Sequence, residues 1–598
     1  MTDEGTPQGR EDEGTSRPDG ADTAISQSVH TGAPQGAARK KSRLGLFLVS
    51  LFALLLVGSG AVAGVLYAIR GTSDVLISKV PADSLAYVTV YLDPAAGQKI
   101  NVARLAQKFP ALRGAGLGRS LDELMDATLA GTDMSFGNDI QPWMGSQAAL
   151  VLVMDGDVPG VALLVDSRDD DAASRTLDEI KQGYGQGKET AYEGATIWDG
   201  GSSSMAMVDG TVVFGDSERI VERVIDTANG GESLSSVDAY SDTTRALPTQ
   251  RLASAFVNGT EVIDAISSRM TASDVASADR QLLSSLEAFR GMGMALSAES
   301  DGLSLKFASS IDSSKLPDNT EEVAPHRNSV LGWVPMDSYG LLAGTGLGGN
   351  LQGLKDQMEE ASPGSSVALD LFGVGAAINS LQGDYGLVVS PMRVDLGADA
   401  GTDITPAGAF MMATNDDAAM QDFLDSVSVL VARAMADGLM ERTVTTSERA
   451  VPPVDDMTPI RMITPTWQTE EYGGATISYL PVSGKSAELS DIAPAYVVSD
   501  GMAIIATSPD EAKALLDARS GDSISQNPNF NSAMTHADEK NTGLMFVNTE
   551  QILDALKASA GPNGLSDEMS NMEPIGSVVM TSGGTRDTPT ATVFILIR

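Results

Sequence analysis

The longest uninterrupted apolar stretch of the chain runs from Leu44 to Ile69 and contains no charged residue. A helix needs about 20 apolar residues to cross a bilayer, so this stretch predicts a transmembrane helix over residues 44–69. Four basic residues lie between positions 39 and 43, whereas only Arg70 follows closely. Because basic residues collect on the cytoplasmic side, we expect residues 1–43 in the cytoplasm and the C-terminal part outside it. The pattern therefore predicts a single-pass cell-envelope protein with a large extracytoplasmic domain.

A cleaved signal peptide is the alternative interpretation, because Ala61-Val62-Ala63 resembles an A-x-A cleavage site. The h-region of a signal peptide has about 7 to 15 residues, whereas this apolar run continues to Ile69, which favours a retained anchor. Within the run, Gly60 and Gly64 form a G-x-x-x-G pattern that allows two helices to approach closely. Self-association through this face is a further hypothesis.

Beyond the anchor, short strand patterns alternate with helical ones. Residues 195–198, 205–208 and 211–214 predict strands, and Asp209-Gly210 is typical of a tight hairpin turn, because Gly accepts a positive φ. Apolar residues at helical spacing then predict a helix around 220–225. This unit predicts an α+β fold in which helices cover one face of an antiparallel sheet.

The same unit recurs near the C-terminus. Asp500-Gly501 holds the turn, and residues 502–506 form the next predicted strand. Ser508, Pro509 and Glu511 then have the spacing of a capping box, with Ser508 as N-cap and Pro509 at the first helical position.

An internal duplication organises the chain after the anchor. Residues 80–84, VPADS, are echoed by residues 334–338, VPMDS. The later matches pair GVALLVDSRDDDAAS from Gly160 with GAFMMATNDDAAM from Gly408, Tyr192–Ile197 with Tyr472–Ile477, and AFVNGTEVIDAI ending at Ile266 with MFVNTEQILDAL ending at Leu556. Four matches in one order indicate a whole lobe copied once. We expect both copies to share one topology, with Phe256 and Phe546 in equivalent buried places.

These patterns divide the chain into successive parts. We expect a disordered cytoplasmic tail over 1–43, the transmembrane helix over 44–69, a juxtamembrane segment over 70–79, an external lobe 1 over 80–311, a linker over 312–328, and an external lobe 2 over 329–598 in which residues 442–470 form an inserted surface loop.

The segment VPADSLAYVTVYLDP, followed by LAQKFPALRG just outside a single N-terminal anchor, resembles the bacterial domain-of-unknown-function family 3352. The resemblance covers most of the chain after the anchor and rests on structural motifs: a Pro-x-Asp sequence leading into a strand and a helix ending at Phe109-Pro110. It implies an uncharacterised membrane-anchored envelope protein and brings no catalytic residue or cofactor. Lobe 2 departs from the pattern, with GTGLGGN where lobe 1 has YLDPAAGQ.

The composition is acidic and lacks cysteine. Asp and Glu total 80 against 40 Lys and Arg, a formal charge of −40, which argues against nucleic acid as a partner. Without any Cys, the external domain is held together by core burial rather than disulfides.

Two local motifs invite sharper hypotheses. Gly344-Thr345-Gly346-Leu347-Gly348-Gly349 fits a dinucleotide fingerprint, with a predicted helix over 351–360, but lobe 1 lacks these glycines, which favours a strand-to-helix turn. The acidic residues Asp166, Asp169, Asp170 and Asp171 lack calcium-loop spacing. Asp170-Asp171 is matched by Asp416-Asp417, and helix capping is the preferred role of both pairs.

Catalytic residues are scarce. The three histidines are His30 in the predicted tail, His326 in the predicted linker and His536 in a predicted loop. Neither external histidine has a counterpart in the other lobe, so we expect both as exposed, solvated side chains. No catalytic, cofactor-binding or metal-binding residue is assigned.

Two function classes remain open. The preferred hypothesis is a binding module that recognises an envelope component or a protein. The alternative is a carboxylate-dependent envelope hydrolase, or a carrier of an apolar ligand between the lobes. Converging carboxylates in a pocket would favour the hydrolase, and an apolar tunnel the carrier.

Overall fold

The computed structural model describes residues 73–110, 134–184, 187–268, 286–316, 323–362, 364–370, 373–381, 383–391, 393–397, 401–405, 407–446, 466–481, 493–560, 569 and 571–598. All of them belong to one compact unit, Ser42–Arg598. No helix within these ranges is long and apolar enough to span a bilayer. The predicted tail, the predicted span over 44–69, and Gly60 and Gly64 within it lie outside the described residues, so the anchor stays a prediction.

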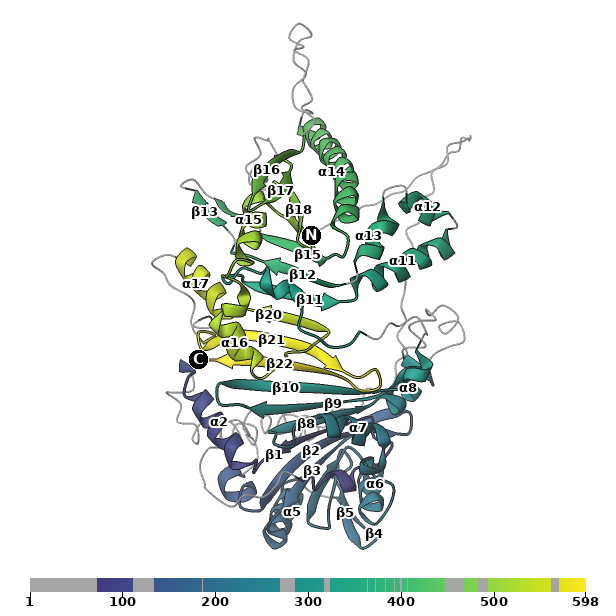
Figure 1. The fold of residues 1–598 in the computed structure, drawn as a ribbon. Coiled ribbons are helices and arrows are strands. Elements are labelled where there is room, and N and C mark those ends of the chain that lie inside the picture. Colours follow the sequence, from purple (N-terminus) through teal and green to yellow (C-terminus); the bar gives the residue numbers. More distant parts are fainter. Residues whose placement is uncertain are drawn as a thin grey trace, which may run out of the picture. The chain divides into compact units, whose positions relative to one another are not determined.

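The described strands form one 20-stranded antiparallel sheet and a separate hairpin (Figure 1). The strands of the first half are β1 (Ala86–Tyr91), β2 (Met144–Asp155), β3 (Val158–Ser167), β4 (Lys188–Tyr192), β5 (Ala195–Asp199), β6 (Ser204–Val208), β7 (Thr211–Gly215), β8 (Ala253–Asn258), β9 (Phe289–Ala298) and β10 (Gly302–Ile311). Those of the second half are β11 (Gly340–Thr345), β12 (Asp384–Val389), β15 (Gly408–Ala413), β16 (Gln468–Tyr472), β17 (Ala475–Tyr479), β18 (Ala495–Ser499), β19 (Met502–Ala506), β20 (Gly543–Val547), β21 (Ile575–Gly584) and β22 (Pro589–Ile597), while β13 (Arg393–Gly397) and β14 (Gly401–Thr405) form the hairpin. The fold is therefore α+β with a large antiparallel sheet, as the sequence predicts.

The strand order is the same in the two halves. The pairings run β4-β5-β6-β7-β3-β2-β1-β8-β9-β10 in the first and β16-β17-β18-β19-β15-β12-β11-β20-β21-β22 in the second. The last strands, β10 and β22, pair with each other and join the halves into one sheet. The duplication expected from sequence is thus present in the topology, whereas the lobe boundaries over 80–311, 312–328 and 329–598 stay predictions.

Helices also recur in matching places. After the first strand of each half come α2 (Ala96–Ala106) and α11 (Leu347–Ala361); later come α5 (Asp170–Tyr184) and α14 (Asp417–Thr446), α6 (Glu218–Ala228) and α15 (Pro509–Ala518), α7 (Asp238–Ala246) and α16 (Pro528–Met534), and α8 (Gly259–Ser267) and α17 (Thr549–Ala560). Short helical turns are η1 (Ile77–Lys79), η2 (Phe136–Ile140), η3 (Leu234–Ser236), η4 (Ser313–Lys315), η5 (Ser329–Gly332) and η6 (Ile524–Gln526), and the second half adds α12 (Ser365–Asp370) and α13 (Val374–Ser380).

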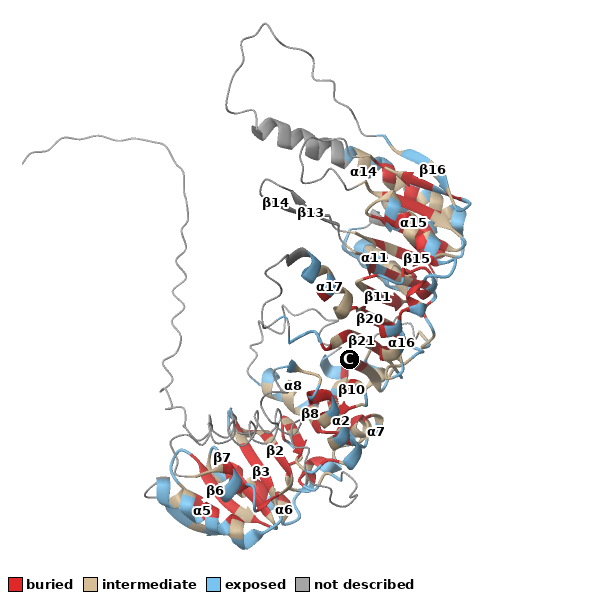
Figure 2. Ribbon diagram, turned by 90° about the vertical axis from the view of Figure 1, so that its left-hand side faces the viewer, coloured by how far each residue is buried: buried red, intermediate tan, exposed pale blue. Residues whose placement is uncertain are grey.

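Helices pack on both faces of the sheet, which corrects the expectation of one covered face. Alternate strand residues point to opposite faces. On one face, which we term the covered face, α6 and α7 pack on the first half and α15 and α16 on the second. On the opposite face, which we term the groove face, α5 and η2 pack on the first half, and α13 and α14 on the second. Figure 2 shows α7, α15 and α16 on one side of the strands.

Phe256 and Phe546 occupy equivalent buried places, as predicted. Phe256 lies opposite Tyr87 and Phe546 opposite Leu341, which are equivalent positions of β1 and β11. Each ring meets an aromatic residue of α7 or α16 edge to face, at centroid distances of 5.3 and 5.2 Å. Such pairs contribute about 0.5–1.5 kcal/mol beyond area burial, so the two copies share a core contact as well as a topology.

The predicted turns and caps are mostly present. Asp209 and Asp500 have positive φ angles of 44° and 52° in their hairpin turns. The Ser508 hydroxyl accepts a hydrogen bond from the amide of Glu511, which confirms the N-cap. The reciprocal half of the predicted capping box is not formed, because the buried Glu511 carboxylate accepts a bond from Ser390 instead. Helix α14 continues to Thr446, past the predicted start of the 442–470 loop; residues 447–465 lie outside the description.

Candidate functional site

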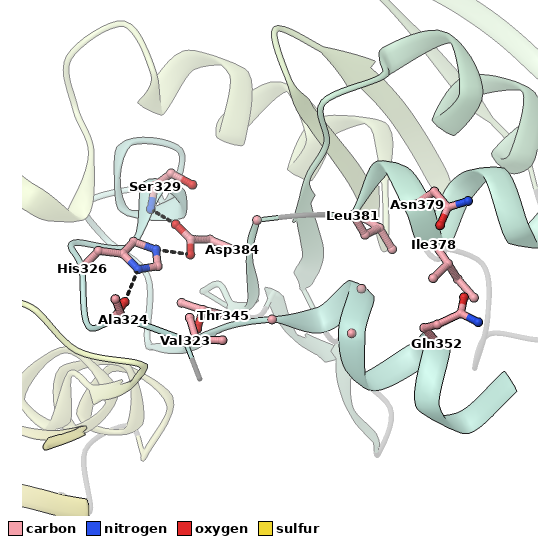
Figure 3. A pocket seen from close by; sticks show the side chains of 14 residues that line it. Val323, Ala324, His326, Ser329, Thr345, Gln352, Ile378, Asn379, Leu381 and Asp384 are labelled. Carbon is pink, nitrogen blue, oxygen red and sulfur yellow. Dashed lines mark hydrogen bonds and ion pairs between the residues drawn. The ribbon is translucent and has the colours of Figure 1, made fainter. Parts of the chain in front are cut away.

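A cavity of about 700 Å³ lies where the chain enters its second half (Figure 3). Its lining comes from the segment before η5, the end of β11, the first turns of α11, the end of α13 and the start of β12: Val323, Ala324, His326, Ser329, Thr345, Gly346, Gly348, Gly349, Gln352, Ile378, Asn379, Leu381, Gly383 and Asp384. The cavity therefore includes both His326 and part of the glycine-rich motif.

His326 is held by both ring nitrogens. Nε2 lies 2.7 Å from Oδ1 of the buried Asp384, and Nδ1 lies 3.0 Å from the Ala324 carbonyl oxygen. A carbonyl and a carboxylate both accept, so this geometry is satisfied by an imidazolium that donates twice. The backbone contact with Ala324, and then Asp384, raises the pKa of His326. The expectation of an exposed, solvated His326 is therefore wrong: the side chain is half-buried and bonded.

The first half has an uncharged counterpart of the His326–Asp384 pair, and its contacts indicate the role of the pair. Asp384 accepts a hydrogen bond from the backbone amide of Ser329, while Gln147, at the equivalent position of β2, accepts one from the amide of Val75. Gln147 also donates to the Ser73 carbonyl oxygen. In each half, a buried side chain near the start of the second strand thus ties down the segment that leads into the first strand. His326 and Asp384 are the charged version of a tie that lobe 1 makes with one neutral amide.

The pair is poorly arranged for nucleophilic catalysis. A general base needs a free ring nitrogen to take a proton from a nucleophile. Both nitrogens of His326 are engaged, and Ser329 contacts Asp384 through its backbone amide. The geometry supports a structural role.

The glycine-rich motif forms the predicted strand-to-helix turn. Gly346 has a φ of 75° and precedes α11, which begins at Leu347 rather than at the predicted Leu351. A Cβ on Gly348 would lie 2.0 Å from the Leu381 carbonyl oxygen, so close packing of α11 on α13 requires glycine there. The next strand, β12, pairs with β11 antiparallel. A dinucleotide site requires a parallel β-α-β unit, so this motif does not form one.

The other sequence candidates have structural partners. Asp169 and Asp416 accept hydrogen bonds from Ala172 and Ala419 and cap α5 and α14. Capping is confirmed, although the matched caps are Asp169 and Asp416 rather than the pairs Asp170-Asp171 and Asp416-Asp417. Asp166 instead accepts bonds from the amide and hydroxyl of Ser146.

His536 also differs from its expectation as an exposed side chain. Its ring stacks on Phe594 at a centroid distance of 4.3 Å, and Nε2 lies 2.8 Å from Asp301. Within the described ranges, no group of three metal-ligating side chains comes together.

A second feature is a row of apolar side chains on the groove face of the second half, which we term the open row. Its members lie directly opposite one another on neighbouring strands: Met545, Leu342, Leu387, Phe410 and Ile505. Leu342, Leu387 and Ile505 are 52%, 46% and 40% exposed, and Val389, two residues along from Leu387, is 42% exposed. Neighbouring aliphatic side chains that are about half exposed on central strands are consistent with a binding surface.

Lobe 1 provides an internal reference for the open row. The equivalent positions are Ala255, Val88, Leu150, Leu163 and Phe214, paired in the same order. Leu163 and Phe214 are buried, and Val88 and Leu150 pack against the same core cluster. Leu342, Leu387 and Ile505 are thus more exposed than their counterparts in lobe 1, whereas Phe410 packs against the core cluster of its own half.

Two aromatic residues contribute to the core cluster on this face of lobe 1. Phe136 and Trp143, in and just after η2, belong to that cluster. Ile140 and Met144 flank Trp143 and correspond to Ala377 and Leu381, which lie in the matching cluster of lobe 2. At the same spacing, Gly373 replaces Phe136 and Ser380 replaces Trp143. Small residues thus stand in lobe 2 at the places of two aromatic residues of lobe 1, while the cluster on this face of lobe 2 contains other aromatic residues, among them Tyr385 and Tyr496.

Sequence reasoning missed both the tie and the open row. The tie was hidden because Asp384 lies 58 residues after His326 and its equivalent is a glutamine. The sequence signal for the row is weak. The segments LLAGT and GLVV are apolar on both strand faces, a pattern that indicates burial of both faces rather than one exposed face.

Comparison with known proteins identifies the family of the chain but gives no activity for it. The sequence model of the family described as "Protein of unknown function (DUF3352)" matches residues 48–597. No curated protein matches the chain. Among solved structures, crystal forms I, IV and III of TP0453 match at 10%, 8% and 10% identity, covering 40%, 41% and 43% of this chain and 80%, 81% and 82% of theirs, each with a TM-score of 0.22.

Proposed function

Since the chain belongs to the family described as Protein of unknown function (DUF3352), which supplies no activity, we propose a function from the structure itself. The protein is a binding module of the cell envelope that holds an apolar ligand on its open row. The proposal includes the anchor over residues 44–69, the cytoplasmic placement of residues 1–43 and the extracytoplasmic placement of both lobes.

The exposure of Leu342, Leu387 and Ile505 carries the proposal. Fully burying a Leu or Ile side chain contributes about 1.5–3 kcal/mol, so leaving three of them about half exposed forgoes part of that stabilisation. A ligand that covers them recovers part of it on binding. This favours the apolar-ligand alternative over carboxylate catalysis, since the described cavity brings only Asp384 to its wall, already paired with His326.

The absence of native cysteine allows a direct test. The full chain carrying Leu387→Cys, placed in nanodiscs, is labelled with a maleimide in the presence and absence of hexadecanol. We expect the ligand to slow labelling at position 387 about fivefold or more, the protection given by burial of an exposed thiol. Val158→Cys is the matched control, because Val158 is 54% exposed on a strand of lobe 1 away from the row. Unchanged labelling at 387, or equal slowing at both positions, contradicts the proposal.

A further inference from the structure

We infer that His326 acts as a pH-dependent switch for one wall of the cavity: its protonated ring holds residues 323–326, which we term the strap, and its neutral ring releases them. The inference concerns this cavity and goes beyond the binding function proposed for the open row. Its observations are the place of the strap in the cavity wall, the two acceptors that face the ring, and the uncharged tie of lobe 1.

The strap forms one wall of the cavity (Figure 3). Val323, Ala324 and His326 line the cavity together with the glycines at the start of α11. The side chain of Val323 packs against this helix start, because a Cβ on Gly346 would lie 3.2 Å from Val323 Cγ2. Movement of the strap therefore changes the width of the cavity beside α11.

The chain that follows the strap is fixed by contacts that do not involve the imidazole ring. The backbone of His326 exchanges two hydrogen bonds with that of Asn541, at 3.2 and 3.0 Å. The buried Asn328 side chain donates to the Gly344 carbonyl oxygen at 3.0 Å. Loss of a ring contact therefore frees the strap before this point and leaves the chain after it in place.

The two ring contacts of His326 require a proton on each nitrogen. The Ala324 carbonyl oxygen near Nδ1 and the Asp384 carboxylate near Nε2 are both acceptors. A neutral imidazole has one N–H group, so it donates to only one of them. The carboxylate is the stronger acceptor and keeps the proton on Nε2, which turns the lone pair of Nδ1 toward the Ala324 carbonyl oxygen. This repulsion opens the turn over residues 324–326 and releases the strap.

The charged groups around the ring set the direction of the switch. Asp384 on β12 is the charged group that acts on the ring, and its second oxygen accepts a bond from the Ser329 amide at 2.6 Å. Arg327, the next residue of the chain, lies 3.9 Å from Glu539 of the segment before β20. The contact with Ala324, and then Asp384, raises the pKa of His326, so the strap is held at low pH and released as the pH rises through that pKa.

Lobe 1 makes the equivalent tie without a titratable group. The neutral amide of Gln147 accepts a hydrogen bond from the Val75 amide and donates one to the Ser73 carbonyl oxygen. One side chain thus serves as donor and acceptor at any pH. The pH dependence is therefore a property of lobe 2, where a histidine and a carboxylate share the two roles.

Distances between two spin labels across the cavity test the inference in the full chain, which has no native cysteine. Ala324→Cys and Asn379→Cys place one nitroxide on the strap and one on α13, at exposed residues that both line the cavity (Figure 3). Double electron–electron resonance is recorded from about pH 6 to about pH 8.5, on either side of the ordinary histidine pKa. We expect the population with longer distances to rise about fivefold, the change given by loss of one hydrogen bond.

Two variants of the labelled chain, checked for folding by circular dichroism, assign the effect to this pair. In His326→Gln the distance distribution should not change with pH. In Asp384→Asn the midpoint of the change should fall to lower pH, because the ring loses the neighbouring negative charge. A distribution that is constant with pH in the parent chain, or that changes equally in His326→Gln, overturns the switch. An unchanged midpoint in folded Asp384→Asn overturns its assignment to His326 and Asp384.

Discussion

Lys306 lies directly opposite Thr592 where the two halves of the sheet meet. These residues are themselves equivalent: each lies at the same register position of the last strand in its half, as the β9–β10 and β21–β22 pairings show. Antiparallel pairing of equivalent strands places a local two-fold axis between them. The joint also removes one exposed edge from each half, which protects both from edge-to-edge aggregation.

The register of this joint predicts a specific disulfide. Directly opposed residues of antiparallel strands have Cα atoms about 4.5–5.5 Å apart, within the range of disulfides. The double variant Lys306→Cys/Thr592→Cys should oxidise to an intramolecular disulfide, detected by mass spectrometry of linked peptides. Lys306→Cys/Thr588→Cys, with the second cysteine in the turn just before β22, serves as the control and should oxidise far less. Equal oxidation of the two pairs would show that the register is wrong.

The duplication can be tested by giving Asp74 the residue that stands at the equivalent position of the second half. Its half-buried carboxylate accepts bonds from the Tyr87 hydroxyl and the Ile77 amide, and desolvation is the main cause of its raised pKa. The equivalent residue, Asn328, accepts a bond from the Val330 amide through a neutral side chain.

A raised pKa means that the folded protein favours the protonated carboxyl. The contribution of Asp74 to stability is therefore greatest at low pH and falls as the pH rises from about 4, its unfolded value, through the folded pKa. Asp74→Asn should be neutral or stabilising at pH 7, while Asp74→Ala should cost about 1–3 kcal/mol by leaving the Tyr87 hydroxyl and Ile77 amide unpaired. Chemical denaturation measures both. Destabilisation by Asp74→Asn comparable to that by Asp74→Ala would refute the equivalence.

The tie between His326 and Asp384 predicts a pH dependence with a different cause, because hydrogen-bond acceptors rather than burial raise this pKa. The folded pKa of His326 is raised, so its contribution to stability is fully present below about pH 6.5 and is lost as the pH rises through the folded pKa. The difference in unfolding free energy between wild type and His326→Gln should therefore shrink as the pH rises above neutral. Asp384→Gln, which copies Gln147 of lobe 1, should weaken this dependence. Parallel pH profiles for wild type and His326→Gln would be incompatible with the tie.

Local signals in the sequence were sufficient for the fold class and the repeat. Strand β19 begins at Met502 and ends at Ala506 as predicted, because an Asp-Gly turn and a Ser-Pro cap bracket it with specific backbone chemistry. The ordered matches could reveal the copied topology because they preserve pairs such as Phe256 and Phe546.

Relations between distant residues were beyond local patterns. The joining of β10 to β22, the His326 tie and the exposure of Leu387 each depend on which strands become neighbours, and nothing in a single strand's alternation specifies that. The small residues at positions 373 and 380, where lobe 1 has Phe136 and Trp143, likewise become visible only when the copies are aligned.

Ligand contact with the open row can be measured through Trp467. Its ring packs edge to face on Tyr496 at 5.0 Å, and Tyr496 lies opposite Ile505. A brominated hexadecanol bound along the row should quench the emission of Trp467 in the full chain, saturably and at a bromine position near the middle of the alkyl chain. In Trp467→Phe, the emission of the three remaining tryptophans should be quenched much less. Absence of saturable quenching in the wild type, or equal fractional quenching in Trp467→Phe, would contradict ligand binding at the open row.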